Sequence, residues 1–578
     1  MPPSRVWSFR RTDPDLEREF EQRLRLSPLA ARVLATRGIA SSDAGRTFLD
    51  ASLKDLSAPA DLTGTALAVE RLVRAIAQRE RILVFGDSDV DGLTGASLLA
   101  RLLLALGADV DVHVSERTVE GYGLSEAGEA AVRKKAPAVL VTVDHGVTAH
   151  AAVGRLQQGG IDVIVTDHHQ KPEQLPPGLA VLNPLFLDPA HPAAKLSGAG
   201  VAFKLACGLF ETLSPQKKQD PRLRQTLREG LAFAALGTVA DVVSLTGENR
   251  LLVRHGLKQL AQTTVPGLAA LRSFARLDGR EIDAEDVSFG FAPRINAAGR
   301  MGQVDLARRL LLSDSTAEAS KLAAELDRLN QERRALEARV HQRAQLKLKE
   351  WPTDAAMVVL SDREFHAGVI GIVAAKLVSQ TGKPVVLIAS DGTTARGSGR
   401  SVPGFDLAAA LHLARDCMRS CGGHAMAAGL EMDPERADEL AARLRDIARD
   451  TMQPPPPATL ELDGEAMLHQ ITFPLVQELR QLGPFGQGHP QPLFAASGIE
   501  LAVPPRRVGV EGGHLQLKLR NGPHVMAGIA FGQGARADEI AGRKVAVAFT
   551  PRPSTFAGNH GVELQIADVK PDPGPGAR

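Results

Sequence analysis

Cysteine is scarce in this sequence, whose 578 residues contain only Cys207, Cys417 and Cys421. Three thiols so widely spaced exclude both a disulfide framework and a metal site built from four thiolates. Cys417 and Cys421 are four residues apart and would share one face of a helix. We interpret them more simply as small buried residues.

Long apolar runs and an excess of one charge are also missing. No uncharged apolar stretch reaches about 18 residues, and the segment Met1–Trp7 lacks the apolar core of a signal peptide. We therefore expect a cytoplasmic protein with no membrane partner. Lys and Arg number 68 against 67 for Asp and Glu, so any binding to nucleic acid must come from local patches.

The length implies roughly three or four domains, because one hydrophobic core does not grow to this size. Changes in pattern along the chain predict the boundaries. We expect an N-terminal helical segment (1–60), an α/β domain (61–313), a connecting helix (314–350), a smaller α/β domain (351–453), a β-barrel (458–568) and a disordered tail (569–578).

Residues 81–166 alternate between short β-branched runs and helical patterns. The strands are predicted at Arg81–Phe85, Asp109–Val114, Ala138–Val143 and Ile161–Thr166. Alternation at this spacing is typical of a mostly parallel, doubly wound sheet. The fold class is therefore α/β, with the barrel added at the C-terminal end.

The later segments contain helices, two small-residue loops and the barrel strands. Ser315–Lys349 has no Gly or Pro and carries one leucine-rich stripe, which predicts a long amphipathic helix joining two domains. Ala292–Arg300 and Arg396–Ser401 are rich in small residues and arginine, and we expect both to be loops. Pro454–Pro457 predicts a linker.

Carboxylates and imidazoles follow three of the predicted strands, and another carboxylate follows a helix. They are Asp87, Asp89, Asp91, Asp144, Asp167, His168, His169 and Asp241. Ligands bind at the carboxyl ends of strands in open α/β sheets, so these side chains should meet in one crevice. Their mutual repulsion requires cations, and oxygen-rich ligands with one or two imidazoles suit Mn²⁺ or Mg²⁺. The alternative is that the first three aspartates cap a helix, but one would be enough.

These segments resemble the four motifs of the DHH phosphoesterase superfamily, in the same order. The motifs are Gly86–Gly92, Val143–Gly146, Thr166–His169 and Thr238–Asp241. Arg294–Arg300, Gly397–Ser401 and Gly422–Ala425 resemble the RecJ branch of that superfamily and its DHHA1 domain, and the barrel resembles its OB-fold. The resemblance covers roughly residues 60–570. It implies a nuclease of DNA repair and recombination that uses Mn²⁺ or Mg²⁺ to degrade single-stranded DNA from the 5′ end to mononucleotides.

The resemblance also assigns roles to individual residues. It places catalytic roles on Asp144, His168 and His169, with His169 nearer the scissile phosphate. It implies metal ligands at Asp87, Asp89, Asp91, Asp144, His168 and Asp241, without deciding which of the first three bind directly. Binding of the strand, including its terminal phosphate, is implied for Arg117, Arg294, Asn296, Arg300, Ser398, Arg400, Ser401 and His424.

Two positions depart from the family pattern. Residue 88 is Ser where the family usually has an aromatic residue, and residue 145 is His where Asn or Cys is usual. His145 either adds an imidazole beside the metals or hydrogen-bonds within its loop, and the sequence favours neither.

The predicted barrel carries an excess of basic residues that suits a groove for single strands. They are Arg506, Arg507, Lys518, Arg520, Arg543 and Lys544, opposed by few acids. The candidates for base stacking are Phe531, Phe549 and Phe556. A barrel that only braces the enzyme is the alternative.

Two other functions are compatible with the motifs. One is a DHH-type phosphodiesterase acting on short oligonucleotides or cyclic dinucleotides, although those relatives usually lack the barrel. The other is a catalytically inactive DNA-binding scaffold, which intact aspartates argue against. The resemblance further implies single-stranded DNA-binding protein and a RecQ-type helicase as partners.

Overall fold

The first domain is built on a five-stranded sheet in which every neighbouring pair of strands is parallel. The computed structural model describes residues 5–117, 119–213, 220–454, 458–554 and 561–572. The strand order is β3-β2-β4-β5-β6. The strands are β2 (Arg81–Gly86), β3 (Asp109–Val114), β4 (Val139–Val143), β5 (Asp162–Thr166) and β6 (Ala180–Leu182).

Helices cover both faces of this sheet because alternate strand residues point to opposite sides. Ile82 and Val84 pack with α4 (Thr65–Gln78), α5 (Val90–Ala105) and α8 (Gly198–Thr212). Leu83 and Phe85 pack with α6 (Glu126–Lys135) and α7 (His150–Gln158). The prediction of a doubly wound sheet is confirmed, and its strand order reverses between β2 and β4.

Helices complete the first domain beneath the sheet. They are α10 (Pro221–Ala240), α11 (Gly247–Ala261), α12 (Pro266–Phe274), α13 (Ala284–Asp286), η4 (Val287–Phe291), α14 (Ala292–Arg300) and α15 (Val304–Leu312). The expectation of a loop at Ala292–Arg300 is wrong. The segment continues directly from α13 and η4 as helix α14, and its Ile295 is buried.

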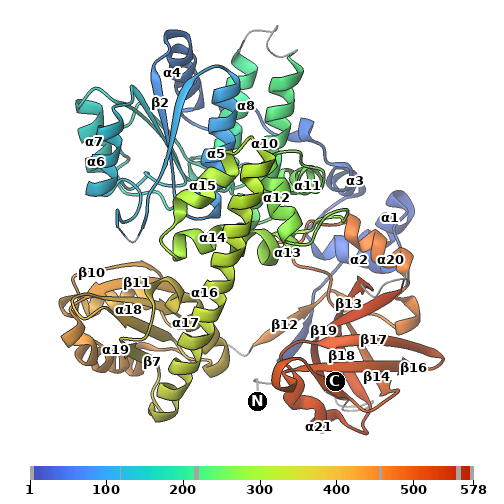
Figure 1. Cartoon of the computed structure of the whole chain (residues 1–578). Helices are drawn as coiled ribbons and strands as arrows, with labels where there is room; N and C mark the ends of the chain where they lie inside the picture. The colour runs from blue at the N-terminus through green and yellow to red at the C-terminus, as the bar shows by residue number, and fades with distance from the viewer. Residues whose placement is uncertain (1–4, 118, 214–219, 455–457, 555–560, 573–578) are drawn as a thin grey trace.

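The 35-residue helix α16 (Thr316–Glu350) leads from the first domain to the second, as expected (Figure 1). The second sheet has the order β10-β11-β9-β8-β7. Its strands are β7 (Val358–Asp362), β8 (Val385–Ser390), β9 (Ala395–Arg400), β10 (Ser420–His424) and β11 (Ala427–Met432). One face packs against α17 (Ala367–Thr381), and the other against α18 (Leu407–Leu413) and α19 (Ala437–Thr451). The loop expected at Arg396–Ser401 is wrong: the segment is mostly strand β9, paired on both sides.

The C-terminal domain is a barrel, as expected. Its strands follow the order β13-β14-β18-β19-β17-β16-β15, and a further pairing of β14 with β16 closes the sheet. They are β13 (Gly464–Glu465), β14 (Phe494–Leu501), β15 (Arg506–Val508), β16 (His514–Asn521), β17 (His524–Ala530), β18 (Val545–Pro553) and β19 (Val562–Pro571). Helix α20 (Phe473–Gln481) packs beside it.

The N-terminal segment packs on this barrel, although the two parts are far apart in the sequence. Strand β1 (Val6–Phe9) pairs in parallel with β12 (Thr459–Leu462). The segment was expected to be helical, and this strand is an exception. The helices α1 (Pro14–Leu24), α2 (Pro28–Thr36) and α3 (Ser42–Asp50) follow. Phe20 and Leu34 are fully buried in the core that contains the barrel's Phe494 and Phe549. Among the described residues, no helix combines the length and apolar character needed to cross a membrane.

Candidate metal centre and phosphate cleft

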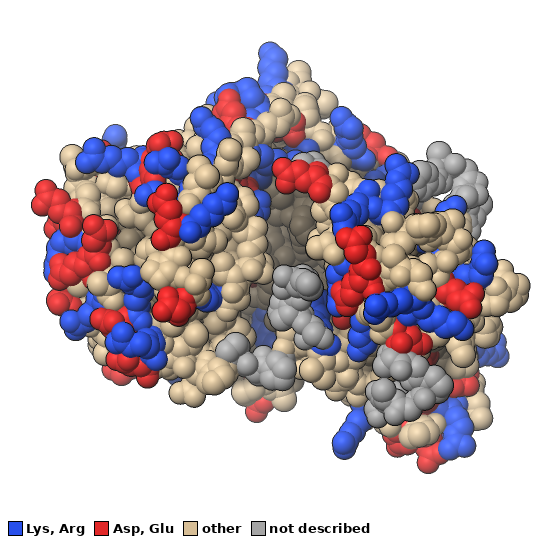
Figure 2. All heavy atoms as spheres, turned by 90° about the horizontal axis from the view of Figure 1, so that it is seen from below, with Lys and Arg blue, Asp and Glu red and all other residues tan. Residues whose placement is uncertain are grey.

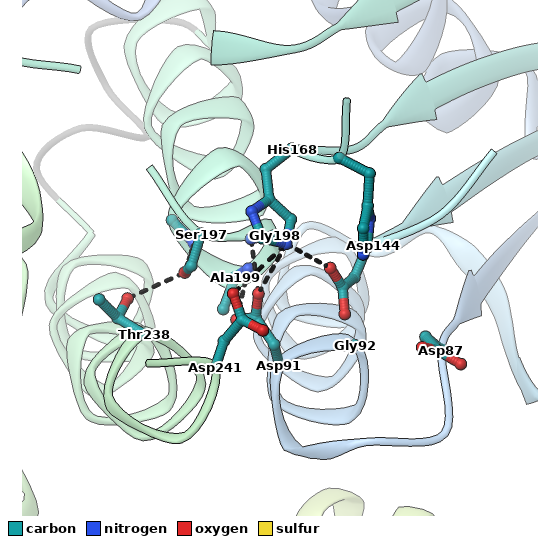
Figure 3. Close-up of polar contacts among 12 residues, drawn as sticks. Asp87, Asp91, Gly92, Asp144, His168, Ser197, Gly198, Ala199, Thr238 and Asp241 are labelled. Atoms are coloured by element: carbon teal, nitrogen blue, oxygen red, sulfur yellow. Dashed lines mark hydrogen bonds and ion pairs between the residues drawn. The ribbon is translucent and has the colours of Figure 1, made fainter. Parts of the chain in front are cut away.

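Acidic and imidazole side chains meet at the carboxyl ends of the central strands (Figure 3). Asp87 follows β2, Asp144 follows β4, and His168 and His169 lie just beyond β5. Asp241 caps the C-terminal end of α10 and lies within reach of the same cluster. The predicted convergence at the point where the strand order reverses is therefore observed.

The imidazole of His168 is surrounded by three carboxylates. Its Nε2 lies 3.0 Å from Asp144 Oδ1, 3.5 Å from Asp241 Oδ2 and 3.8 Å from Asp91 Oδ2. Asp144 Oδ1 and His168 Nε2 are buried and form no hydrogen bond within the part of the chain that the structure describes. Buried polar atoms without partners are costly, and a shared cation would satisfy both of them.

Among the described residues, three groups of side chains bring their ligand atoms within 4.8 Å of one another. They are Asp144 with His168 and His169, Asp91 with His168 and Asp241, and Asp87 with Asp89 and Asp144. Asp144 and His168 each belong to two groups, so the cluster offers adjacent cation positions that share ligands. Oxygen-rich sets with one or two imidazoles suit Mn²⁺ or Mg²⁺, and shared carboxylates are typical of paired metals.

The aspartates of the first motif differ in their contacts. Asp89 accepts hydrogen bonds from the backbone N–H groups of Asp91 and Gly92, at 3.0 and 3.2 Å, and so caps α5. The two oxygens of Asp91 accept from the N–H groups of Gly198 and Ala199, at 2.6 and 3.0 Å. Asp89 is therefore the aspartate that caps α5, whereas backbone N–H groups of α8 fix the position of Asp91.

The electrostatics of the cluster favour a bound cation. Burial raises the pKa of Asp89 to about 6, and repulsion from Asp87 adds to the shift. Burial, followed by the charge of Asp91, raises the pKa of Asp241 to about 8 and that of Asp144 well above its usual range. A divalent cation removes this penalty because it stabilises the charged carboxylates.

Strained backbone and close packing support the cluster. Asp144 and Val242 have left-handed φ angles of 67° and 61°, which are unusual for residues other than glycine. A Cβ atom on Gly237 would lie 2.4 Å from Asp91 Oδ1, and one on Gly198 would lie 2.7 Å from Asp144 Oδ1. Only glycine lets these two helices approach the carboxylates so closely.

Asp167, whose individual role is not evident from the sequence, positions the second histidine of its motif. Its Oδ1 accepts from the Nδ1 of His169 at 2.7 Å and from two backbone N–H groups, and its Oδ2 accepts from Val147 N at 2.9 Å. The hydrogen bond to Asp167 raises the pKa of His169 to about 9. This shift favours the protonated imidazole, which can donate a proton but cannot bind a metal, so Asp144 and His168 are the stronger ligands of their group.

His145 hydrogen-bonds with the backbone. Its Nε2 donates to the carbonyl oxygen of Phe85 at 3.0 Å, and its ring packs edge-on against the Phe85 ring. Burial lowers the pKa of this imidazole. His145 therefore does form a hydrogen bond, but its acceptor lies on strand β2 and not within the loop that contains His145.

A cleft of about 460 Å³ lies beside the cluster, between the two α/β domains. Asp89 and Arg117 line it from the sheet side, and Gly368 of α17 contributes on the side of the second domain. Four of the predicted substrate-binding residues line the cleft: Arg117, Asn296, Arg300 and Ser398. Ser88 also lines the cleft.

The cleft concentrates positive charge. Burial lowers the pKa of Arg300, and the nearby guanidinium groups of Arg333, Arg400 and Arg117 lower it further. Arg400 donates to Ser398 Oγ at 3.2 Å and to Gly399 O at 2.8 Å, so it stands beside this wall. Cations that repel one another in a half-buried cleft form a site for an anion.

Three other predicted residues are not brought to the cleft. Arg294 donates to Asp327, Gly290 O and Phe274 O, at 2.8, 2.5 and 3.0 Å, so its guanidinium is engaged between helices. Ser401 is buried and donates to Phe405 O at 2.8 Å. His424 is exposed on β10 and lies outside the cleft lining.

The barrel presents the predicted basic residues on its surface. Lys518 and Arg520 alternate with the buried Leu517 and Leu519 along β16, and the other four basic residues are also exposed. The stacking candidates differ: Phe531 is exposed, whereas Phe549 is fully buried in the barrel core and unavailable for stacking. Phe556 lies outside the described residues.

Comparison with known proteins agrees with this architecture. The DHH family N-terminal domain matches residues 81–238, the DHHA1 domain matches 354–450, and the RecJ OB domain matches 462–568. Among relatives, the single-stranded-DNA-specific exonuclease RecJ of Salmonella typhimurium is 34% identical over 94% of this chain and 96% of its own length. RecJ of Bacillus subtilis is 34% identical over 91% of this chain, which spans 66% of that relative.

Solved structures give the same result. The crystal structure of RecJ from Thermus thermophilus in complex with Mn²⁺ has a TM-score of 0.82 and 35% identity, and it covers 98% of this chain and 79% of its own. The complex of that protein with Mg²⁺ has a TM-score of 0.76 and 33% identity, with 98% and 78% coverage. The parallel sheet with its Asp and His cluster defines a DHH-type phosphoesterase. With the second α/β domain and the barrel added, the chain belongs to the RecJ family.

Proposed function

We propose that this chain is a metal-dependent exonuclease that degrades single-stranded DNA from its 5′ end to mononucleotides, in DNA repair and recombination. The observation that carries the proposal is the set of three adjoining Asp and His groups beside a cleft lined by arginines. Family membership supports the substrate and the direction, since no distance in the site distinguishes a 5′ end from a 3′ end.

Mn²⁺ or Mg²⁺ would be held by Asp87, Asp89, Asp91, Asp144, His168 and Asp241. When bound, such cations activate a water and stabilise the leaving oxygen of a phosphodiester. His169 adds a proton donor: its Nδ1 is fixed on Asp167, which leaves Nε2 to face the phosphoryl group. An imidazolium in this position stabilises negative charge that develops on the phosphate.

The terminal phosphate would bind in the cleft, with Arg117 and Arg300 as its main partners and Asn296, Ser398 and Arg400 beside them. Arginine's planar fork matches phosphate oxygens with two parallel hydrogen bonds. Because the cleft adjoins Asp89, an anchored phosphate sets which bond reaches the metal centre. We retain Arg294 as a positioning residue that holds α14 against α16, with Asp327 as its partner.

The remaining strand would run toward the barrel. Seen from below, the surface is hollowed between the second α/β domain and the barrel (Figure 2). The exposed Lys518 and Arg520 would contact the phosphate backbone, and Phe531 is the remaining candidate for stacking. A barrel that binds long strands favours this function over hydrolysis of cyclic dinucleotides.

We further propose that the working units are the catalytic domain (61–313), the connecting helix (314–350), the DHHA1 domain (351–453) and the OB-fold domain (458–568), in a cytoplasmic enzyme. Single-stranded DNA-binding protein and a RecQ-type helicase are the partners that the family suggests.

A substrate comparison tests the proposal. The purified chain with Mn²⁺ should degrade a long single strand, leave the matched blunt duplex intact, and lose activity when EDTA is added. Hydrolysis of dinucleotides or cyclic dinucleotides with no attack on long strands would instead support the phosphodiesterase alternative. Binding to the strand without any cleavage would support the scaffold.

A further inference from the structure

Arg117 is held against the metal cluster, although it also lines the phosphate cleft. Its Nη2 contacts Asp87 Oδ2, its Nε donates to Asp87 Oδ1 at 3.2 Å, and Asp89 Oδ2 lies 3.8 Å from Nη2. Both oxygens of Asp87 therefore face the guanidinium, and Oδ1 also accepts from Ser88 N at 2.7 Å.

Asp87 also belongs to a candidate ligand group, to which it contributes one carboxylate oxygen together with Asp89 and Asp144. A carboxylate oxygen that coordinates a cation directly cannot also accept a close hydrogen bond along the same direction. Asp87 is 1% exposed, so its carboxylate has little room to present another face. The guanidinium and a divalent cation therefore compete for Asp87.

Arg117 has a second position within reach. Its side chain is 46% exposed, and its guanidinium carbon lies 5.2 Å from the centre of the Tyr122 ring. Rotation about its side-chain bonds, without any movement of the backbone, would turn the fork from Asp87 to the cleft that it already borders. Among the arginines that line this cleft in the described part of the chain, only Arg117 contacts a member of the metal cluster.

We propose that Arg117 exchanges between Asp87 and the strand's terminal phosphate, and that metal binding drives the exchange. A cation at Asp87 displaces the guanidinium, which then becomes available to the phosphate in the cleft. Metal and phosphorylated end thus bind cooperatively, and by thermodynamic linkage each increases the affinity for the other. This inference rests on the proposed function and adds a coupling to it: a filled metal centre and a bound phosphorylated end favour each other.

Metal titration tests the first half of the exchange without any measurement of nuclease activity. Titration calorimetry with Mn²⁺ alone should give a dissociation constant at least about fivefold lower for Arg117→Ala than for the wild type, the lower end of ordinary coupling. Arg117→Gln, which keeps a polar side chain but removes the charge and the guanidinium fork, should behave in the same way. The matched control is Arg300→Ala, which removes a charge from the same cleft without touching Asp87 and should change the constant by less than about twofold. Unchanged or weaker Mn²⁺ binding in both Arg117 variants, or an equal gain in Arg300→Ala, would overturn the exchange.

Strand binding tests the second half. The probe is a strand whose first linkages are non-hydrolysable methylenephosphonates, with or without a 5′ phosphate, followed by fluorescence anisotropy. Saturating Mn²⁺ should increase the wild-type preference for the phosphorylated strand at least about fivefold, and Arg117→Ala should abolish this increase. An increase of the same size in Arg117→Ala would contradict the inference. If the wild type degrades no single strand, the proposed function fails and the metal titration still decides the exchange. If it degrades strands but the titration is flat, only the exchange fails.

Discussion

At the scale of single residues, the centre depends on buried acids whose charges are tolerable only beside a cation. Asp144 and His168 connect the candidate groups because each is shared by two of them. Replacing either by Ala should reduce turnover by orders of magnitude while the protein remains folded. Single-turnover cleavage at saturating Mn²⁺, with circular dichroism as the control for folding, measures this. Near-wild-type turnover in either variant would remove these residues from the centre.

Asp167 provides a second test at this scale, because it acts through the histidine that follows it. Asp167→Asn should reduce kcat by about 10- to 100-fold, the usual effect of losing a residue that orients a site side chain. His169 would lose the anionic partner that raises its pKa, so the alkaline limb of the pH–rate profile should move to lower pH. The profiles of variant and wild type measure the shift. A reduced kcat with an unmoved profile would mean that Asp167 has only a structural role through Val147.

The positions of the acids were predictable from sequence because parallel strands end at one edge of a sheet. The contact of Arg294 with Asp327 was not predictable, because Asp327 lies 33 residues away on another helix. Asp167 fixes His169 through one oxygen, while the backbone N–H of Val147 holds its other oxygen, and no side-chain pattern reveals that backbone contact. Spacing predicts which residues approach the site, and packing decides how each is used.

At the scale of elements, strongly patterned segments were predicted well and glycine- and arginine-bearing segments were not. The alternation of Leu515, Leu517 and Leu519 with polar residues marks β16 directly. Ala292–Arg300 is short, and its helical form depends on contacts with α16 that local composition does not contain. The N-terminal segment shares a hydrophobic core with the barrel, and its strand β1 pairs with β12, more than 450 residues further along the chain.

The hydrophobic core that the two parts share predicts that the N-terminal segment stabilises the barrel. Phe20 is fully buried in the shared core, so Phe20→Ala should lower the free energy of unfolding of this unit by about 3–5 kcal/mol. Urea unfolding followed by the fluorescence of Trp7, in a Trp351→Phe background, measures it. The control is Leu53→Ala at an exposed site of the same segment, which should stay within about 0.5 kcal/mol. Equal effects of the two substitutions would separate the segment from the barrel core.

His489 links the same unit to pH. It is 3% exposed, stacks on Phe485 and donates to Leu482 O at 2.9 Å, and burial lowers its pKa to about 4. In the unfolded chain His489 binds a proton near pH 6.5. The contribution of His489 to the free energy of unfolding is therefore complete above pH 6.5 and is lost as the pH drops toward 4. The loss should reach about 3 kcal/mol, which is the shift in pKa converted to free energy. Urea midpoints at pH 4.5 and 7 measure it, and a His489→Phe variant that keeps the full pH dependence would contradict the assignment.

At the scale of the whole molecule, the net charge of +1 gives no sign of the local excess of Lys and Arg that strand binding requires. The affinity for a single strand should fall steeply with salt, with a slope of about −0.7 per phosphate neutralised. Lys518→Ala combined with Arg520→Ala should make this slope shallower by about 1.4. Arg449→Ala, at an exposed site on α19, is the control and should leave the slope unchanged. Point substitutions are the appropriate tool here, because deleting the barrel would expose the core that it shares with Phe20.

The central claim is that a metal centre at the strand ends, fed through an arginine-lined cleft, removes nucleotides from the 5′ end of a single strand. The most direct test is a 5′-phosphorylated strand labelled at its 3′ end and incubated with the chain and Mn²⁺. Progressively shorter labelled fragments should appear only with metal and should be absent with Asp144→Ala. Immediate release of the label as a mononucleotide, or the same ladder in the presence of EDTA, would contradict it.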